Sequence, residues 1–235
     1  MGKSLHTQNN SIADPVVQLE HLSNGIFATG NLLDFKTSLE KHNIDELRAG
    51  EPEVLQVNVG YMCNQVCKHC HVDAGPDRKE IMTRDTMEHC LSLLNQSASI
   101  HTLDLTGGAP EMNPDFRWFV EEARKIKPNM DIIVRSNLTI ILANPKYHDL
   151  PEFFSKNNVH VVSSLPYYRA AKTDNQRGKG VFSKSIQALI KLNEQGYGMP
   201  ESDLQLDLVF NPAGAFLPAD QSQLENEYKK ELYRS

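Results

Sequence analysis

Residues 55–71 read LQVNVGYMCNQVCKHCH, and this stretch decides the expected fold. Its opening residues alternate apolar and polar side chains, which predicts a β-strand that ends at Gly60. Three cysteines, Cys63, Cys67 and Cys70, follow with C-x3-C-x2-C spacing. The cysteines are therefore expected on a loop directly after the carboxyl end of a strand.

The spacing of these cysteines favours an iron–sulfur cluster. A cubane of four irons usually takes four thiolates, so three cysteines leave one iron open to a substrate or cofactor. The alternative is a zinc site made by the same cysteines with His69 or His71. Structural zinc usually needs a second, distant pair of ligands, and the sequence offers none.

Strand and helix patterns alternate along the rest of the chain. Apolar stretches with strand character recur, and segments with helical spacing separate them. Such alternation implies parallel strands joined by right-handed crossovers, in a sheet that curls toward a barrel. The expected fold is therefore α/β, an open partial (β/α) barrel with five visible units. The predicted strands are 55–59, 102–106, 131–135, 159–165 and 204–210, and the predicted helices lie near 83–95, 113–126, 150–156, 182–195 and 224–232.

The sequence divides into a leader and a core. Residues 1–50 are polar and weakly patterned, with a possible short helix over 32–39, and are expected to pack loosely or to cap the barrel. Residues 51–235 form the expected core. Cys90 falls on the apolar face of the helix at 83–95 and is expected to pack as a small hydrophobic residue. Asn113 is predicted to cap the next helix, and the stretch 176–180 is predicted to be a flexible loop on the substrate side.

A second motif, GGAPE, directly follows the strand at 102–106. Gly107 and Gly108 have no Cβ, so their backbone carbonyls can approach a ligand closely. The carboxylate of Glu111 could pair with an ammonium group. The alternative is a plain tight turn before a helix.

Polar residues near the ends of the strands are further candidates for the pocket. In a barrel, side chains at the carboxyl ends of the strands reach the working face, although alternation turns about half of them outward. The candidates are Asn58, Asp104, Thr106, Arg135, Asn137, Ser163, Ser164, Asp207 and Asn211.

Composition limits the class of partner. The formal net charge is −6, so nothing indicates the clustered basic residues that nucleic acid binding needs, and a small-molecule substrate is expected. The first residues lack an apolar signal core, which predicts no membrane anchor. Three reduced thiols in one motif favour a cytoplasmic location.

The cysteine motif resembles the signature of the radical S-adenosylmethionine (SAM) superfamily. The resemblance implies a [4Fe-4S] cluster on Cys63, Cys67 and Cys70, with SAM on the open iron and an electron donor such as a flavodoxin or ferredoxin. It also implies that the cluster passes an electron to SAM, which splits into methionine and a 5′-deoxyadenosyl radical. The residues implied to contact SAM or the substrate are Gly107, Gly108, Ala109, Pro110, Glu111, Arg135, Asn137, Ser163 and Ser164.

Several segments narrow the resemblance to the arsenosugar-biosynthesis radical SAM proteins. They include 70–76, 105–111, 136–139 and 208–212, and the implied substrate is a methylated arsenical. The chain departs from that pattern at Tyr167, where a cysteine is expected. A sixth unit and a cysteine-containing C-terminal region are also expected and absent, so the chain resembles a truncated form. A non-catalytic remnant that binds the cluster is therefore the alternative to an active enzyme.

Overall fold

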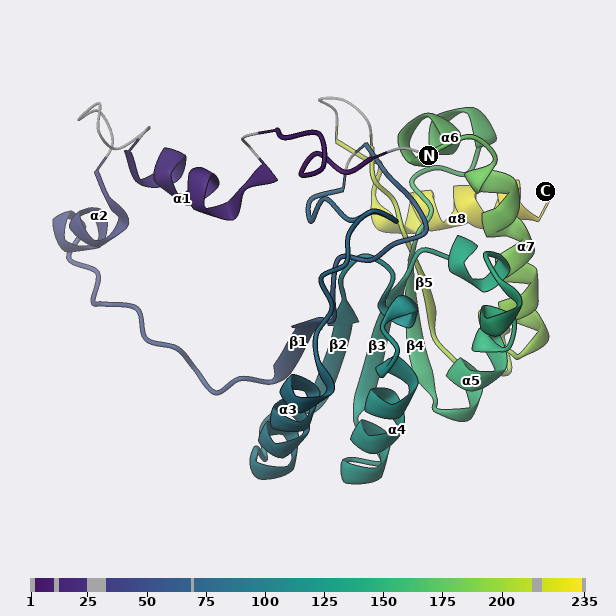
Figure 1. Cartoon of the computed structure of the whole chain (residues 1–235), viewed down its shortest axis with the longest axis horizontal. Helices are drawn as coiled ribbons and strands as arrows, with labels where there is room; N and C mark the ends of the chain where they lie inside the picture. The colour runs from purple at the N-terminus through teal and green to yellow at the C-terminus, as the bar shows by residue number, and fades with distance from the viewer. Residues whose placement is uncertain (1–2, 11–12, 25–32, 69, 213–216, 234–235) are drawn as a thin grey trace.

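An open, five-stranded parallel sheet forms the centre of the molecule. The computed structural model describes residues 3–10, 13–24, 33–68, 70–212 and 217–233. The strands pair in chain order, from β1 to β5, and every pair is parallel. The architecture confirms the predicted α/β class and partial barrel (Figure 1). The strands are β1 Val54–Asn58, β2 Thr102–Thr106, β3 Asp131–Ser136, β4 Val159–Ser164 and β5 Leu206–Val209.

Helices connect the strands and bury their apolar faces. In α3, Met87, Leu91 and Leu94 recur at helical spacing and are buried, and Thr83 caps the helix as its side chain accepts from Thr86 N. Cys90 packs against the same core, as predicted. Helix α4 lies beside α3 (Figure 1). The longer helices of the core are α3 Arg84–Gln96, α4 Phe116–Ile126, α5 Leu150–Lys156, α6 Ala170–Arg177, α7 Val181–Glu194 and α8 Gln221–Leu232, and the short 3-10 helices are η2 Pro110–Met112, η3 Thr139–Leu142 and η4 Pro145–Tyr147.

The start of α4 differs from the prediction. Asn113 does not cap the helix, because η2 comes first and α4 begins only after Asp115. The Asn113 side chain is buried, and its Nδ2 donates to the carbonyls of Val59 and Met82, each at 2.9 Å. Asn113 therefore ties the chain after β2 to the chain after β1.

The stretch 176–180 also differs from the prediction. Gln176 and Arg177 form the last turn of α6, and Arg177 is buried with 5% of its surface exposed. Only Gly178–Gly180 connects α6 to α7, and Gly180 has a φ of +79° that suits glycine. The prediction of a flexible loop was wrong because the sequence of α6 has no apolar stripe that would indicate a helix. The burial of Arg177 depends on polar contacts instead.

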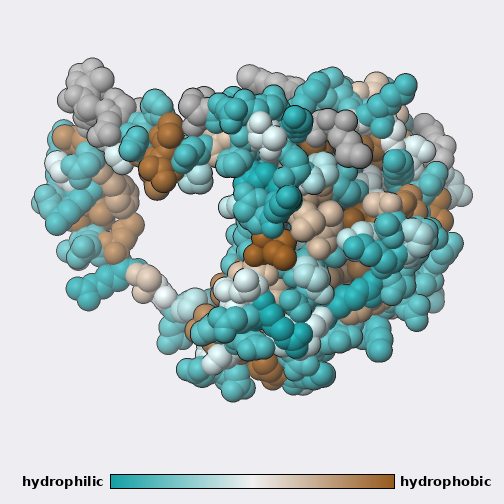
Figure 2. All heavy atoms as spheres, in the orientation of Figure 1, coloured by the Kyte–Doolittle hydropathy of each residue, from teal (hydrophilic) through white to brown (hydrophobic). Residues whose placement is uncertain are grey.

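The N-terminal part of the chain forms an arm. Helices α1 Pro15–Asn24 and α2 Phe35–Lys41 stand away from the sheet, and the space-filling view shows an open gap between them and the core (Figures 1 and 2). The segment before the arm contacts the core, where Ser4 Oγ donates to Asp77 Oδ2 at 2.8 Å. Within the described ranges, no helix is long and apolar enough to cross a membrane.

Candidate active-site cleft

A cleft of 310 Å³ opens at the carboxyl ends of the strands. The loop after β1 contributes Cys63, Cys67 and Cys70, and α6 contributes Arg177. The structure thus brings the predicted cysteine loop and several predicted strand-end residues to one cavity. The predicted residues that line it are Cys63, Cys67, Cys70, Thr106, Gly107, Gly108, Arg135, Asn137, Ser164 and Asn211.

The two glycines after β2 hold the base of the cysteine loop. Gly108 N donates to Gly60 O at 2.9 Å, and Ala109 N donates to Met62 O at 2.8 Å. A Cβ on Gly108 would lie 2.4 Å from Met62 O, and one on Gly107 would lie 2.5 Å from Gly60 O. Glycine is required here because one backbone segment lies directly against another. Both glycines also line the cleft.

The three thiols have different surroundings. Cys63 is buried, whereas Cys67 and Cys70 are half-buried. Cys70 Sγ accepts from Ala74 N at 3.3 Å, and Cys63 Sγ accepts from Asn137 Nδ2 at 3.5 Å. Burial raises the pKa of Cys63 to about 11 and also raises that of Cys67, where Arg177 opposes the shift. Thiolates at these positions need nearby positive charge, which bound iron would supply.

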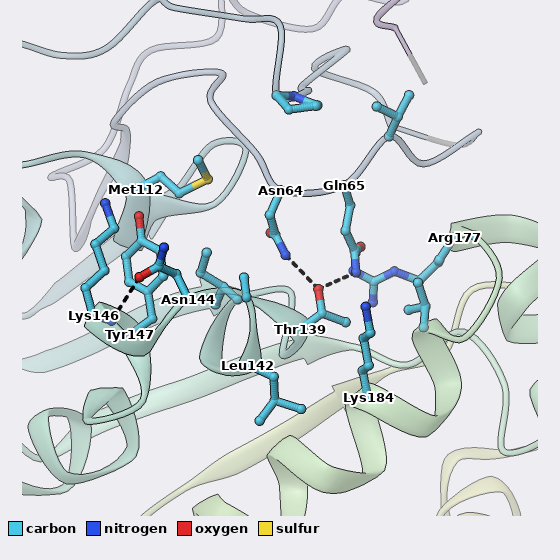
Figure 3. Close-up of a pocket in the computed structure, with 16 residues that line it drawn as sticks. Asn64, Gln65, Met112, Thr139, Leu142, Asn144, Lys146, Tyr147, Arg177 and Lys184 are labelled. Atoms are coloured by element: carbon cyan, nitrogen blue, oxygen red, sulfur yellow. Dashed lines mark hydrogen bonds between the residues drawn. The ribbon is translucent and has the colours of Figure 1, made fainter. Parts of the chain in front are cut away.

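A chain of polar side chains supports the loop. Gln65 Nε2 and Asn64 Nδ2 both donate to Thr139 Oγ1, at 2.6 and 2.9 Å (Figure 3). Thr139 Oγ1 donates to Asn137 Oδ1 at 3.1 Å, and Asn137 Nδ2 also donates to Asn64 Oδ1 at 2.7 Å. The N–H groups of Asn137 are therefore engaged by Cys63 and Asn64. A cofactor contact through them would require one of these bonds to break.

Arg177 completes this network from α6. It donates to the carbonyl of Ser164 and, through Nη2, to Gln65 Oε1 at 3.0 Å. The same Gln65 Oε1 accepts from Cys67 Sγ at 3.4 Å. The sequence predicts only a flexible loop over 176–180 and gives Arg177 no role of its own, and the two glycines that follow it are the only local signal.

Arg135 is fixed by an ion pair. Its Nε donates to Asp104 Oδ1 at 2.9 Å and its Nη2 to Asp104 Oδ2 at 2.8 Å. Gln56 Nε2 donates to the same Oδ2 at 2.7 Å. The Asp104 carboxylate therefore accepts hydrogen bonds from side chains on both neighbouring strands, β1 and β3. The pKa of Arg135 is raised by its hydrogen bond with Asp104. The guanidinium is thereby oriented at the cleft and keeps Nη1 available.

Glu111 lies behind the cleft and is not among its lining residues. Its side chain is buried, and neither carboxylate oxygen has a hydrogen-bond partner in the described structure. Burial raises the pKa of Glu111 to about 7, and the nearby Ser136 opposes the shift only in part. The raised pKa favours the neutral form of the carboxyl group, and the predicted contact of Glu111 with an ammonium group stays a prediction.

The remaining predicted residues, Asn58, Ala109, Pro110, Ser163 and Asp207, lie outside the cleft lining. Ala109 and Pro110 are buried beside it, and Ser163 is fully buried with a hydroxyl that has no described partner. Asp207 is exposed and contacts His160 Nε2 at 2.9 Å. Tyr167 stacks on Tyr168 with ring centroids 4.1 Å apart. The predicted roles of Ala109, Pro110, Ser163 and Asp207 remain untested.

The donor set in the cleft, three thiols around one cavity, is compatible with a cluster. Among the described residues, no three His, Cys, Asp or Glu side chains are placed to hold one metal ion, and His69 lies outside those residues. In a cubane each thiolate binds a different iron, so the thiols need to surround a cavity instead of meeting at one point. Cys63, Cys67 and Cys70 line such a cavity.

Solved structures share this fold. The chain aligns with anSMEcpe with bound AdoMet and Cp18Cys peptide at a TM-score of 0.52 and 18% identity, over 67% of this chain and 42% of that one. It aligns with Streptococcus suis SuiB bound to S-adenosylmethionine at a TM-score of 0.55 and 16% identity, over 84% of this chain and 40% of that one. Both are radical SAM enzymes, and this chain spans less than half of each. No protein-family model and no curated protein matches the chain.

Proposed function

We propose that the chain is a radical SAM enzyme that holds a [4Fe-4S] cluster on Cys63, Cys67 and Cys70. The observation that carries the proposal is the meeting of three thiols and the Gly107–Gly108 backbone in one cleft of 310 Å³. This cleft lies at the carboxyl ends of an open parallel sheet, where barrels of this kind carry their sites. The shared fold with two SAM-bound enzymes is consistent with it.

The residues of the cleft have distinct proposed tasks. When bound, the reduced cluster and SAM supply the chemistry, since one electron splits the sulfonium into methionine and a 5′-deoxyadenosyl radical. The three cysteines leave the fourth coordination place open for the amino and carboxylate groups of SAM. Gly107 and Gly108 present backbone carbonyls to the ammonium, and Arg135, oriented by Asp104, pairs with the carboxylate. Asn137 positions the cysteine loop.

The proposed substrate class is a small methylated arsenical, as in arsenosugar biosynthesis. Its support is the sequence resemblance of segments such as 105–111 and 208–212. Arg135 and Ser164 line that cleft and are available to contact a polar substrate.

Low-temperature electron paramagnetic resonance tests the proposal. The protein is reconstituted with iron and sulfide under anaerobic conditions, reduced with dithionite, and measured with and without SAM. The expected result is a reduced cubane signal that changes when SAM is added. A cubane signal indifferent to SAM would favour a non-catalytic remnant that binds the cluster. Zinc in place of iron would restore the zinc alternative.

A further inference from the structure

A second cavity, of 720 Å³, lies against the cysteine loop. Residues 64–66, which separate Cys63 from Cys67, form one of its walls, and Gln65 and Arg177 line both this cavity and the cleft. We call it the basic groove and define it by residues 64–66, Lys146, Arg177 and Lys184 (Figure 3). The groove thus gives access to the loop that would hold the cluster.

The charge of the basic groove differs from that of the whole chain. Lys146, Arg177 and Lys184 line it, and none of its described lining residues is Asp or Glu. Neither lysine forms an ion pair with a described carboxylate, and the nearest recorded contact of Lys146 Nζ is the Tyr147 ring, at 4.6 Å from its centroid. The formal net charge of the chain is −6. A surface of opposite sign on an acidic protein attracts anionic partners.

Arg177 gives the groove a buried cation that lacks a carboxylate partner. Its described hydrogen bonds go to neutral acceptors, the Ser164 carbonyl and Gln65 Oε1, and its Nε has no described partner. A buried cation without a counter-charge is unfavourable unless negative charge comes near. Negative charge can approach from the cleft, as thiolates, or from the groove, as an anionic partner.

We propose that the basic groove is the docking surface for an acidic one-electron carrier protein, such as a flavodoxin. The inference rests on the proposed function, because each SAM cleavage consumes one electron from outside the chain. The carrier would lose one electron, and a bound cluster would pass that electron on to SAM, whose C5′–S bond would break to give methionine and a carbon radical. The groove fits a protein because both lysines are exposed, where their charge steers a large acidic partner from solution.

Reduction kinetics test the proposal. The double variant Lys146→Gln, Lys184→Gln is compared with the unmodified protein, both as full chains with the reconstituted cluster. Flavodoxin hydroquinone should reduce the double variant at least about tenfold more slowly at low salt, because two attractive charges are lost. Reduced methyl viologen, a small cation, should reduce both proteins at similar rates. Added salt should slow the reduction of the unmodified protein by flavodoxin and have much less effect on the double variant.

The matched control is a double variant that removes two lysine charges outside the groove. Lys156 and Lys230 are exposed and lie outside the groove, so Lys156→Gln, Lys230→Gln should keep the unmodified rate. Equal rates for both double variants would overturn the proposal, because net charge alone would then matter. Reduction of the groove variant at the full rate by flavodoxin would also overturn it. If phosphate abolishes the difference in rate between the groove variant and the unmodified protein, and flavodoxin shows no measurable binding, the groove binds a small anion instead.

Direct binding separates this proposal from the proposed function. The dissociation constant for oxidised flavodoxin is measured at several salt concentrations, with and without reconstitution. If no cluster forms and flavodoxin still binds through the two lysines, the docking surface stands and the function fails. If the cluster forms and binds SAM while flavodoxin ignores the groove, the function stands and the docking surface fails.

Discussion

Arg177 Nη2 donates to Gln65 Oε1 at 3.0 Å, and this bond joins α6 to the middle of the cysteine loop. Gln65 also receives the thiol hydrogen of Cys67 and donates to Thr139. One glutamine therefore links a buried cation, a proposed cluster ligand and η3. The position of the cysteine loop depends on a helix that follows it by about 100 residues in the chain.

Replacing Arg177 should change the reduction potential of the cluster. Reduction adds one negative charge close to the guanidinium, so its loss in Arg177→Gln should disfavour the reduced state. We expect a lower midpoint potential, with a reduction equilibrium about tenfold weaker, or about 59 mV for one electron. A redox titration followed by electron paramagnetic resonance measures it. Arg177→Lys keeps the charge and should recover most of the potential.

The control for Arg177 is Arg169→Gln. Arg169 immediately precedes α6, and its side chain is exposed, with Glu231 Oε2 at 3.9 Å. This variant should keep the original midpoint potential. An unchanged potential in Arg177→Gln at full iron content would contradict the electrostatic role of Arg177, and equal defects in the Gln and Lys variants would indicate a purely structural one.

Cys67→Ala should abolish the cluster. Two thiolates hold a cubane poorly, and Cys67 is the central ligand of the motif. Iron and sulfide content after reconstitution measures the loss. Cys90→Ala is the matched control, because Cys90 packs against the core of α3 and should leave iron binding unchanged. Full iron and sulfide content in Cys67→Ala would refute the ligand assignment.

Gly108→Ala should destabilise the fold. The added Cβ would lie 2.4 Å from Met62 O and 2.9 Å from Tyr61 O, which are backbone atoms that cannot move alone. Overpacking of this kind costs about 1–3 kcal/mol, which lowers Tm by about 2–12 °C in a protein of this size. Thermal unfolding followed by circular dichroism measures it. Gly50→Ala, where no atom lies within 4 Å of the added Cβ, should leave Tm nearly unchanged.

The elements that were predicted correctly have local signals in the sequence. The alternation of apolar and polar residues predicts the strand at residues 55–59, and the helical spacing of apolar residues predicts the buried face of α3. The three cysteines stand close together in the chain, directly after that strand, and the parallel pairing follows from the alternation of strands and helices. These features need no knowledge of distant contacts.

The features that were missed depend on distant contacts. Arg177 is buried because Gln65 and Ser164 accept its hydrogens, and no pattern within α6 indicates this. Asn113 looks like a helix cap by its neighbours, but the carbonyls of Val59 and Met82 bind its side chain instead. The glycines after β2 suggested a ligand, and the structure adds that they first accommodate the backbone of the cysteine loop.

Glu111 should make stability depend on pH. Its folded-state pKa is raised to about 7, from 4.5, because its carboxyl group is buried without a hydrogen-bond partner. Below about pH 4.5 the carboxyl group is protonated in both states and its contribution to stability is fully present. As the pH rises through about 7, the unfolded chain is already ionised while the folded state resists ionisation, so this contribution is lost.

Glu111→Gln should remove this dependence because glutamine does not ionise. Relative to the unmodified protein, the free energy of unfolding of the variant should gain up to about 3 kcal/mol between pH 4.5 and pH 8, at about 1.36 kcal/mol per pKa unit. Denaturant unfolding at both pH values measures the difference. Glu121→Gln, an exposed change on α4, should leave the pH dependence of the unmodified protein intact. If Glu111→Gln and Glu121→Gln respond to pH alike, the carboxyl group of Glu111 is solvated and its pKa is not raised by burial.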